Sequence, residues 1–512
     1  MLSKQLFKST AIIGLMTLIS RILGFVRDML IAQIFGVGLA TDAFFVAFKI
    51  PNFFRRLFAE GAFAHAFIPV LADYKETGSQ QELRDLINKT SGILALTLLF
   101  ISLIGMISAP LLIMVLAPGF SLNGTQAELA SRLLMMVFPY LLFITLVAFS
   151  GAILNAHEKF AVPALTPAIL NICMIAATIW LAPLMTEPVM ALAYGVFAAG
   201  IVQVLFQLPA LSRLGLLPRF KIDFQHPGVK RVTSLMLPAI FSVSVTQINL
   251  LLDSLFASFL AVGSVSWLYY SDRLVEFPLG ILGMALSTVI LPQLAKNYVA
   301  NDSQAFSNSL DWGLRLIFLV GMPATIGLFV LAEPMLATLF QYDEFSATDR
   351  VFAGQSLKAY AIGLMGYFMI KILVPGFTSR QDMKTPFRYG VYAMAVSLGL
   401  NLVLIFPLAH AGLALATSLG ACLNGLLLFR KLLQDQVYRP TQGLWLFLFR
   451  IILASGAMAA CLSYWLDIEQ WNQWNATKRV LNLCEWIAIG GFVYMSALLL
   501  LGLRLRHLKI AK

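Results

Sequence analysis

The chain has 512 residues, of which 59% are hydrophobic and 12% are charged, and its mean hydropathy is +0.84. Soluble domains carry about 25% charged residues, so this composition excludes an ordinary soluble protein and indicates one that spans a membrane. The net charge of +11 does not point to nucleic acid, because the basic residues are distributed as orienting charges between membrane helices.

Apolar segments of about 20 residues recur along the chain, and this is the length that a helix needs to cross a bilayer. They show no two-residue alternation, so helices are predicted rather than a β-barrel. The first segment follows Lys4 and Lys8, and we expect it to remain uncleaved because no small-residue cleavage site follows it. About fourteen segments are predicted, at residues 9–35, 41–72, 91–117, 133–155, 162–183, 188–210, 233–262, 267–294, 312–340, 355–378, 386–407, 411–430, 444–466 and 483–504.

The basic residues between these segments predict the orientation of the chain. If the N-terminus is cytoplasmic, 22 of the 36 Lys and Arg residues fall in cytoplasmic loops. Only five fall in outer loops, namely Arg132, Arg350, Lys358, Lys478 and Arg479. Cytoplasmic loops of membrane proteins carry such an excess of Lys and Arg. Both termini are therefore predicted to be cytoplasmic.

An internal duplication is predicted at a separation of about 225 residues. The segment Phe67–Tyr74 (FIPVLADY) is similar to Ile290–Tyr298 (ILPQLAKNY), although chance similarity between apolar helices is an alternative. The separation covers six predicted crossings, so both copies would have the same orientation, with a cleft between the two lobes. The predicted parts are an N-terminal lobe (1–225), a C-terminal lobe (226–435) and two extra helices with a basic cytoplasmic tail (436–512).

Seven basic residues lie inside the predicted spans: Arg21, Arg27, Lys49, Arg55, Arg56, Arg273 and Lys371. Each costs roughly 2.5–3.5 kcal/mol at the centre of a membrane helix on insertion scales, so these side chains should face a cavity, a partner or an interface. Four of them are predicted to bind substrate, because surplus guanidinium groups attract phosphate oxygens. These are Arg21, Arg27, Arg55 and Arg273. The alternative is that they form internal salt bridges that lock helices together.

Other charges on the same helices are expected to support this site. Arg21 and Asp28 are seven residues apart, which places them on one helix face, and Arg56 and Glu60 are at the spacing of a direct ion pair. The supporting charges are Asp28, Asp42, Lys49, Arg56, Glu60, Asp272 and Glu276.

Three residues are candidate hinges, namely Gly24, Pro51 and Pro278. Proline removes a backbone hydrogen bond and bends a helix, so corresponding prolines in two lobes would suit alternating access. The alternative is that Gly and Pro are simply frequent in membrane helices.

These residues fall within motifs that make the sequence recognisable. The motifs are Ser20–Asp28 (SRILGFVRD), Thr41–Asn52 (TDAFFVAFKIPN), Arg55–Phe63 (RRLFAEGAF), Tyr269–Pro278 (YYSDRLVEFP) and Pro375–Pro386 (PGFTSRQDMKTP). They resemble the MurJ (MviN) family of lipid II flippases, which belongs to the multidrug/oligosaccharidyl-lipid/polysaccharide exporter superfamily. The resemblance runs from near residue 3 to about residue 505.

The resemblance implies a fold of fourteen transmembrane helices, with two parallel six-helix lobes that form a V-shaped central cavity. Two extra C-terminal helices would shape a groove for a polyprenyl tail. It implies movement of lipid II from the inner to the outer leaflet of the bacterial cytoplasmic membrane for peptidoglycan synthesis. By motif match, Arg21, Arg27 and Arg273 would hold the pyrophosphate in a cationic cavity, and Asp42, Arg55 and Glu60 match other positions linked to function. Lipid II, membrane lipids and other cell-wall synthesis proteins are the implied partners.

Three alternatives to a lipid II flippase stay open. One is another exporter of the superfamily, for O-antigen lipids or drugs, although a cation exporter should place acids in its cavity. The second is a polyprenyl-phosphate glycosyltransferase, whose nearest candidate acids are in Tyr342–Phe345 (YDEF), without a nearby histidine. The third is a scaffold that transports nothing. We expect no catalytic residues, no cofactor and no metal site, because neither a P-loop nor a Cys/His ligand spacing is present.

Overall fold

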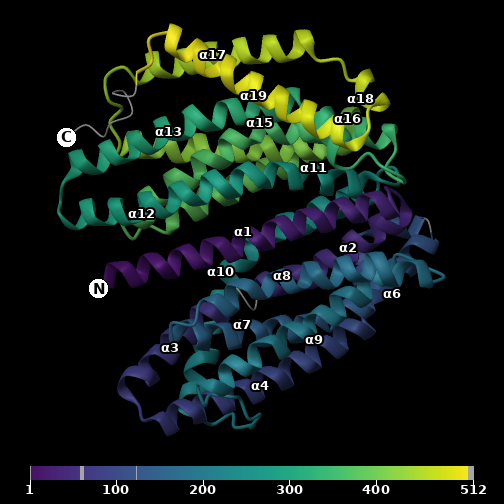
Figure 1. Ribbon diagram of the computed structural model, residues 1–512. Coiled ribbons are helices and arrows are strands. Elements are labelled where there is room, and N and C mark those ends of the chain that lie inside the picture. The colour runs from purple at the N-terminus through teal and green to yellow at the C-terminus, as the bar shows by residue number, and fades with distance from the viewer. Residues whose placement is uncertain (1, 58–62, 123, 505–512) are drawn as a thin grey trace. The chain divides into compact units, whose positions relative to one another are not determined.

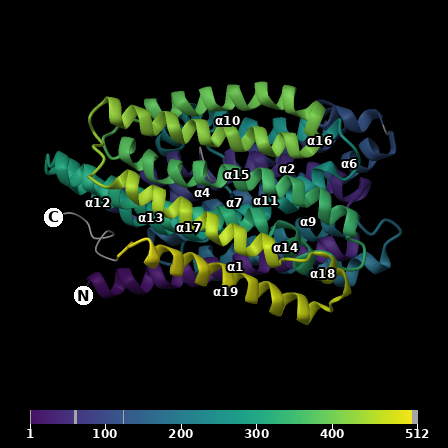
Figure 2. The same cartoon turned by 90° about the horizontal axis from the view of Figure 1, so that it is seen from above.

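The computed structural model describes residues 2–57, 63–122 and 124–504, and within these ranges the chain forms helices and no strand (Figures 1 and 2). Nine helices in the described ranges are long and apolar enough to cross a membrane by length and composition. The all-α membrane fold predicted from the sequence is therefore confirmed. Packing divides the chain into two compact units, Met1–Ser266 and Trp267–Lys512, which are described separately.

The first unit is built around long helices whose apolar faces pack together. Its helices are α1 (Leu2–Phe35), α2 (Leu39–Arg55), α3 (Phe63–Thr77), α4 (Gln80–Ile107), α5 (Ala109–Leu116), α6 (Gly124–Val137), α7 (Tyr140–Ala156), α8 (Ala161–Ala176), α9 (Met190–Arg213) and α10 (Pro227–Ser258). Helix α1 packs along α8, and α3 packs against both α7 and α10 (Figure 1). In the core, the ring of Phe67 lies 5.0 Å from that of Phe63 and 4.9 Å from that of Phe149.

The second unit contains the remaining helices. They are α11 (Ser264–Pro278), which begins at the end of the first unit, a π-helix (Leu279–Gly283), α12 (Met284–Val299), α13 (Ser303–Val330), α14 (Ala332–Leu339), α15 (Ala347–Thr378), α16 (Lys384–Gln434), α17 (Leu444–Trp465), α18 (Glu469–Gln473) and α19 (Ala476–Leu500). Helices α15 and α16 pack together, and α17 packs against both α13 and α19 (Figure 2).

Helix α16 contains two of the predicted spans. Its 51 residues would extend about 77 Å if it were straight, and the hydrocarbon core is about 30 Å thick. The helix is interrupted at Ala409, where φ is 47° and ψ is −126°, two residues after Pro407. This interruption falls between the predicted spans 386–407 and 411–430, so each half corresponds to one span.

All fourteen predicted segments coincide with helical ranges of the described chain, although several consist of two helices. Residues 91–117 cover α4 and α5, with Pro110 in the first turn of α5, and residues 133–155 cover α6 and α7, with Pro139 before α7. Proline lacks the N–H that would continue the preceding helix. Residues 58–62 of the second segment lie outside the described residues.

The packing division at residue 266 lies beyond the lobe boundary predicted at residue 225, because α10 packs against α3 within the first unit. Packing and internal repetition are separate properties of the chain. The boundaries of the two predicted lobes and of the two extra helices therefore stay predictions.

Candidate functional site

Arg27 is buried in the first unit, with a side chain that reaches from α1 to α8. Its Nε and Nη2 donate to Asp28 Oδ1 at 3.0 and 2.7 Å, and its Nη1 donates to Asn171 Oδ1 at 3.0 Å. Both members of the ion pair are buried, with Arg27 6% and Asp28 2% exposed. A charged guanidinium at this place thus has one anionic and one neutral partner among these contacts.

Gly24 of α1 faces Asn171 of α8. A Cβ atom at this position would lie 3.4 Å from the Asn171 side-chain nitrogen, at the limit of ordinary van der Waals contact. Asn171 Nδ2 in turn donates to the backbone oxygen of Ser20 at 2.9 Å. Gly24 thus lies at the contact between the two helices, and its predicted role as a hinge stays a prediction. Arg21, also on α1, is half-buried.

Asp42 is buried near the start of α2 and accepts hydrogen bonds from a distant part of the first unit. The backbone N–H groups of Gly263 and Ser266 donate to its two carboxylate oxygens at 2.6 and 2.8 Å, and the Ser266 hydroxyl donates at 2.6 Å. On the same helix, Lys49 donates to the Ser254 hydroxyl at 2.9 Å.

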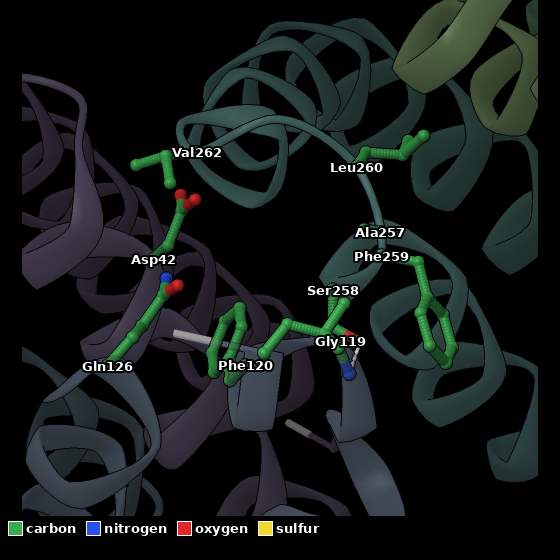
Figure 3. Close-up of a pocket in the computed structure, with 10 residues that line it drawn as sticks. Asp42, Gly119, Phe120, Gln126, Ala257, Ser258, Phe259, Leu260 and Val262 are labelled. Carbon is green, nitrogen blue, oxygen red and sulfur yellow. Dashed lines mark hydrogen bonds between the residues drawn. The ribbon is translucent and has the colours of Figure 1, made fainter. Parts of the chain in front are cut away.

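Beside Asp42, the first unit has a cavity of about 190 Å³ (Figure 3). The segment 119–122 and the segment 257–262 form most of its wall, which includes the rings of Phe120 and Phe259. Gln126 also lines the cavity and is 2% exposed, and its side-chain nitrogen has no hydrogen-bond partner among the described residues. The cavity wall thus combines apolar side chains with three buried polar ones, those of Asp42, Gln126 and Ser258.

The end of α2 carries two further predicted charges. Arg55 Nε donates to Asn52 Oδ1 at 2.7 Å, and both Arg55 and Arg56 are half-buried. Pro51 is buried inside α2, and the chain adopts a π-helical turn at residues 56–57. The predicted Arg56–Glu60 ion pair stays a prediction, because Glu60 lies outside the described residues.

In the second unit, Arg273 projects from α11 with partial exposure. Its Nη1 donates to Glu276 Oε2 at 2.8 Å, and its guanidinium carbon lies 4.8 Å from the centre of the Tyr269 ring. Asp272, the third charge of this predicted cluster, is exposed. Pro278 is the last residue of α11 and is followed at once by the π-helix, so the helix is irregular at the predicted hinge.

Arg315 is a further buried cation, in the first half of α13. It is 8% exposed and its Nε donates to Asp311 Oδ2 at 2.6 Å, while its Nη2 donates to the Thr441 hydroxyl at 2.7 Å. The loop between α16 and α17 covers it, and sequence periodicity gives no sign of that loop. By contrast, Lys371 on α15 and His65 on α3 are exposed.

Each of these arginines carries donors that suit an anion. Guanidinium groups offer planar pairs of donors that match phosphate oxygens. In the described part of the chain, no three His, Cys, Asp or Glu side chains are grouped so that they could hold a metal ion. Asn171 was not predicted as a site residue, although a polar residue inside the apolar span 162–183 could have indicated one.

Comparison with known proteins places the chain among flippases. The family model for the lipid II flippase MurJ matches residues 31–484. The chain is 48% identical over 517 residues to a probable lipid II flippase MurJ of Vibrio cholerae serotype O1, covering 99% of this chain and 98% of that protein. A solved structure of lipid II flippase MurJ in an inward closed conformation superposes with a TM-score of 0.78 at 27% identity, covering 95% of this chain and 97% of that one.

A more distant solved structure shares the fold alone. It is an inward-facing multidrug resistance transporter of the MATE family, within the MOP superfamily, with a TM-score of 0.68 at 12% identity. The alignment covers 82% of this chain and 95% of that chain.

Proposed function

The chain belongs to the MurJ family of lipid II flippases, and from this premise we propose that it moves lipid II from the inner to the outer leaflet of the bacterial cytoplasmic membrane. The cargo would be undecaprenyl-pyrophosphoryl-MurNAc(pentapeptide)-GlcNAc, for peptidoglycan synthesis. Its head group is large, polar and anionic and needs a basic, hydrated cavity, whereas its polyprenyl tail is soluble in lipid.

The observation that carries the proposal is the buried guanidinium of Arg27 on a membrane helix. One of its partners, Asn171, is a neutral amide. A phosphate oxygen can replace a neutral acceptor without leaving a buried charge unpaired, whereas replacing the Asp28 carboxylate would do so. We assign Arg27 to the pyrophosphate together with Arg21, Arg55 and Arg273.

Transport by alternating access requires helices that bend. We assign this role to Pro51 and Pro278 and to Gly24, with support from the π-helical turns that follow both prolines. Single π-helical turns interrupt regular hydrogen bonding and are frequent at functional sites. Flipping breaks no covalent bond, so the proposal needs no catalytic residue and no cofactor.

The proposed setting is the bacterial inner membrane, with both termini in the cytoplasm. The excess of Lys and Arg in alternate loops supports this orientation. Other cell-wall synthesis proteins are proposed partners, because they make and consume the cargo.

The proposed function is tested with the full-length protein in vesicles that contain labelled lipid II in one leaflet. We expect the protein to increase the rate at which a membrane-impermeant reagent gains access to lipid II, compared with empty vesicles. The same vesicles are assayed with an O-antigen lipid, with an organic cation and with a labelled nucleotide sugar. Faster movement of either alternative cargo, or turnover of the sugar, would contradict the proposal.

A further inference from the structure

The connection between α9 and α10 exposes several large apolar side chains although it lies outside the helices. Within residues 216–224, Phe220 is 64%, Ile222 59% and Phe224 56% exposed, and Leu217 is 47% exposed. Contiguous apolar patches on a polar loop mark a surface that contacts a membrane or a partner. We call residues 216–224 the linker segment.

The linker segment is held in place on α4 by its backbone. The N–H groups of Arg219 and Lys221 donate to the side-chain and backbone oxygens of Asn88, at 2.7 and 3.2 Å. A Cβ atom at Gly92 would lie only 2.2 Å from the Lys221 backbone oxygen, so only glycine at this position permits the contact. The exposed apolar side chains therefore project from a fixed backbone.

The acidic side chain of the linker segment faces α4, whereas its basic side chains are exposed. Asp223 accepts an ion pair from Lys89 of α4 at 3.0 Å, and the Lys89 ammonium holds the pKa of the Asp223 carboxyl below its usual range. The single acid of residues 216–224 is thus held against α4, where it shares the Lys89 ammonium with Asp85, at 2.7 Å from the same nitrogen. Arg219 is exposed, and the Lys221 side chain is 59% exposed with Asp85 at 4.0 Å. Positive charge therefore accompanies the exposed apolar side chains.

The position of the segment along α4 places it at the edge of the apolar membrane belt. The exposed apolar side chains of α4 begin at Leu96 and continue through Leu99 and Phe100. Leu96 is four residues from Gly92, which is about 6 Å along the helix axis. The polar interface on each side of the hydrocarbon core is roughly 5–8 Å thick, so the segment lies at the depth of the phospholipid head groups.

We propose that the linker segment is an interfacial anchor that inserts Phe220, Ile222 and Phe224 at the boundary between phospholipid head groups and acyl chains. Arg219 and Lys221 bind the phosphates of the same lipids, because aromatic and aliphatic side chains beside basic ones are the pattern of interfacial membrane binding. In the proposed orientation this is the cytoplasmic leaflet. The anchor fixes the adjoining ends of α4, α9 and α10 at one depth.

The test measures the depth of residue 222 by spin labelling of the full-length protein in vesicles of phosphatidylglycerol and phosphatidylethanolamine. The label is attached to Ile222→Cys in a Cys484→Ser background, since Cys484 is exposed and the other three cysteines are half-buried. Depth is measured as the ratio of two collision rates of the spin label, that with oxygen and that with a water-soluble nickel complex. Leu99→Cys, exposed on the apolar part of α4, and Gln81→Cys, exposed at its polar start, are the reference positions.

We expect a ratio at residue 222 that lies between the two references and is closer to that of Leu99→Cys. A ratio equal to that of Gln81→Cys would overturn the proposal. A label that is accessible to nickel in these vesicles but protected in native membranes would also overturn it, because a protein partner would then cover the segment.

A second variant separates the roles of charge and apolar contact. With Arg219→Gln and Lys221→Gln, the ratio at residue 222 should shift toward that of Gln81→Cys, while the melting temperature stays unchanged because both side chains are exposed. An unchanged ratio would refute the assignment of these two residues to phosphates. None of these readouts depends on transport, so failure of the anchor is distinguishable from failure of the proposed function.

Discussion

In the proposed function, Arg27 serves both stability and transport. Its contact with Asp28 joins two opposite charges in a buried place, and its contact with Asn171 joins α1 to α8. The first contact compensates a charge, and the second is the one that we propose a ligand replaces. A substitution at Arg27 therefore has two effects that need separate measurement.

Replacing Arg27 with glutamine should lower both stability and transport. Losing one partner of a buried ion pair costs about 3–5 kcal/mol, because the remaining charge stays buried. Adding Asp28→Asn removes that charge and should restore most of the melting temperature of the purified protein. Transport should stay lost in the double variant, since no guanidinium remains for the pyrophosphate. A double variant that flips lipid II at the wild-type rate would limit Arg27 to neutralising Asp28.

Asp42→Ala tests the carboxylate that holds Gly263 and Ser266. The change leaves two buried backbone N–H groups without this acceptor, so we expect a loss of about 1–3 kcal/mol for each unsatisfied group. The comparison variant is Thr41→Val, which removes the hydrogen bonds of this hydroxyl to the Gly38 backbone at 2.9 and 3.1 Å and to the Ser266 hydroxyl at 3.2 Å. It leaves the Gly263 and Ser266 N–H groups paired with Asp42. Thermal unfolding should show a larger decrease for Asp42→Ala than for Thr41→Val, and equal decreases would argue against this role.

At the scale of the element, α16 must change direction to place two spans in one bilayer. Ala409 adopts a positive φ, a conformation that side chains with a Cβ rarely take and that costs of order 1–3 kcal/mol. Close by, a Cβ at Gly412 would lie 2.2 Å from the Leu404 backbone oxygen. The turn between the two halves therefore depends on small residues.

Glycine at position 409 should raise the melting temperature, because it adopts this backbone conformation without strain. The same substitution at Ala395, an exposed and regular position of α16, should lower stability by about 1 kcal/mol. The opposite signs of the two effects are the prediction. A decrease at both positions would show that Ala409 is not strained.

Gly92→Ala should displace the linker segment from α4, because the added Cβ would meet the Lys221 backbone oxygen. We expect faster hydrogen exchange at residues 219–221, whose N–H groups lose their bonds to Asn88. Gly456→Ala on α17 is the control, since no heavy atom lies within 4 Å of its Cβ position. Unchanged exchange in Gly92→Ala would show that the segment tolerates the methyl group.

At the scale of the whole molecule, the lengths of the apolar segments predicted the positions of the helices well. Each span is a local property of about 20 residues, set by the thickness of the bilayer. The contacts of the charged residues were less predictable. Asp42 meets N–H groups 221 and 224 positions away, and Arg27 meets an amide 144 positions away. Helix periodicity describes which residues share a face and carries no information about the helix packed against that face.

Asp28 illustrates this limit. Its spacing from Arg21 indicates a shared face of α1, whereas its ion pair with the adjacent Arg27, with both side chains buried, does not follow from helix periodicity. The break in α16 was visible as two apolar spans, whereas the strained backbone at Ala409 was not. The loop that covers Arg315 likewise depends on tertiary packing.

The most direct test of the account is the leaflet accessibility of lipid II in vesicles that contain Arg21→Ala, Arg27→Ala or Arg273→Ala protein. We expect each variant to insert in the membrane and to lose flipping, because the pyrophosphate loses a cationic donor. Arg132→Ala is the control, since Arg132 is exposed and paired with Glu187 at 2.6 Å, and it should flip at the wild-type rate. Wild-type rates in all three arginine variants would contradict the assignment of these arginines to lipid II.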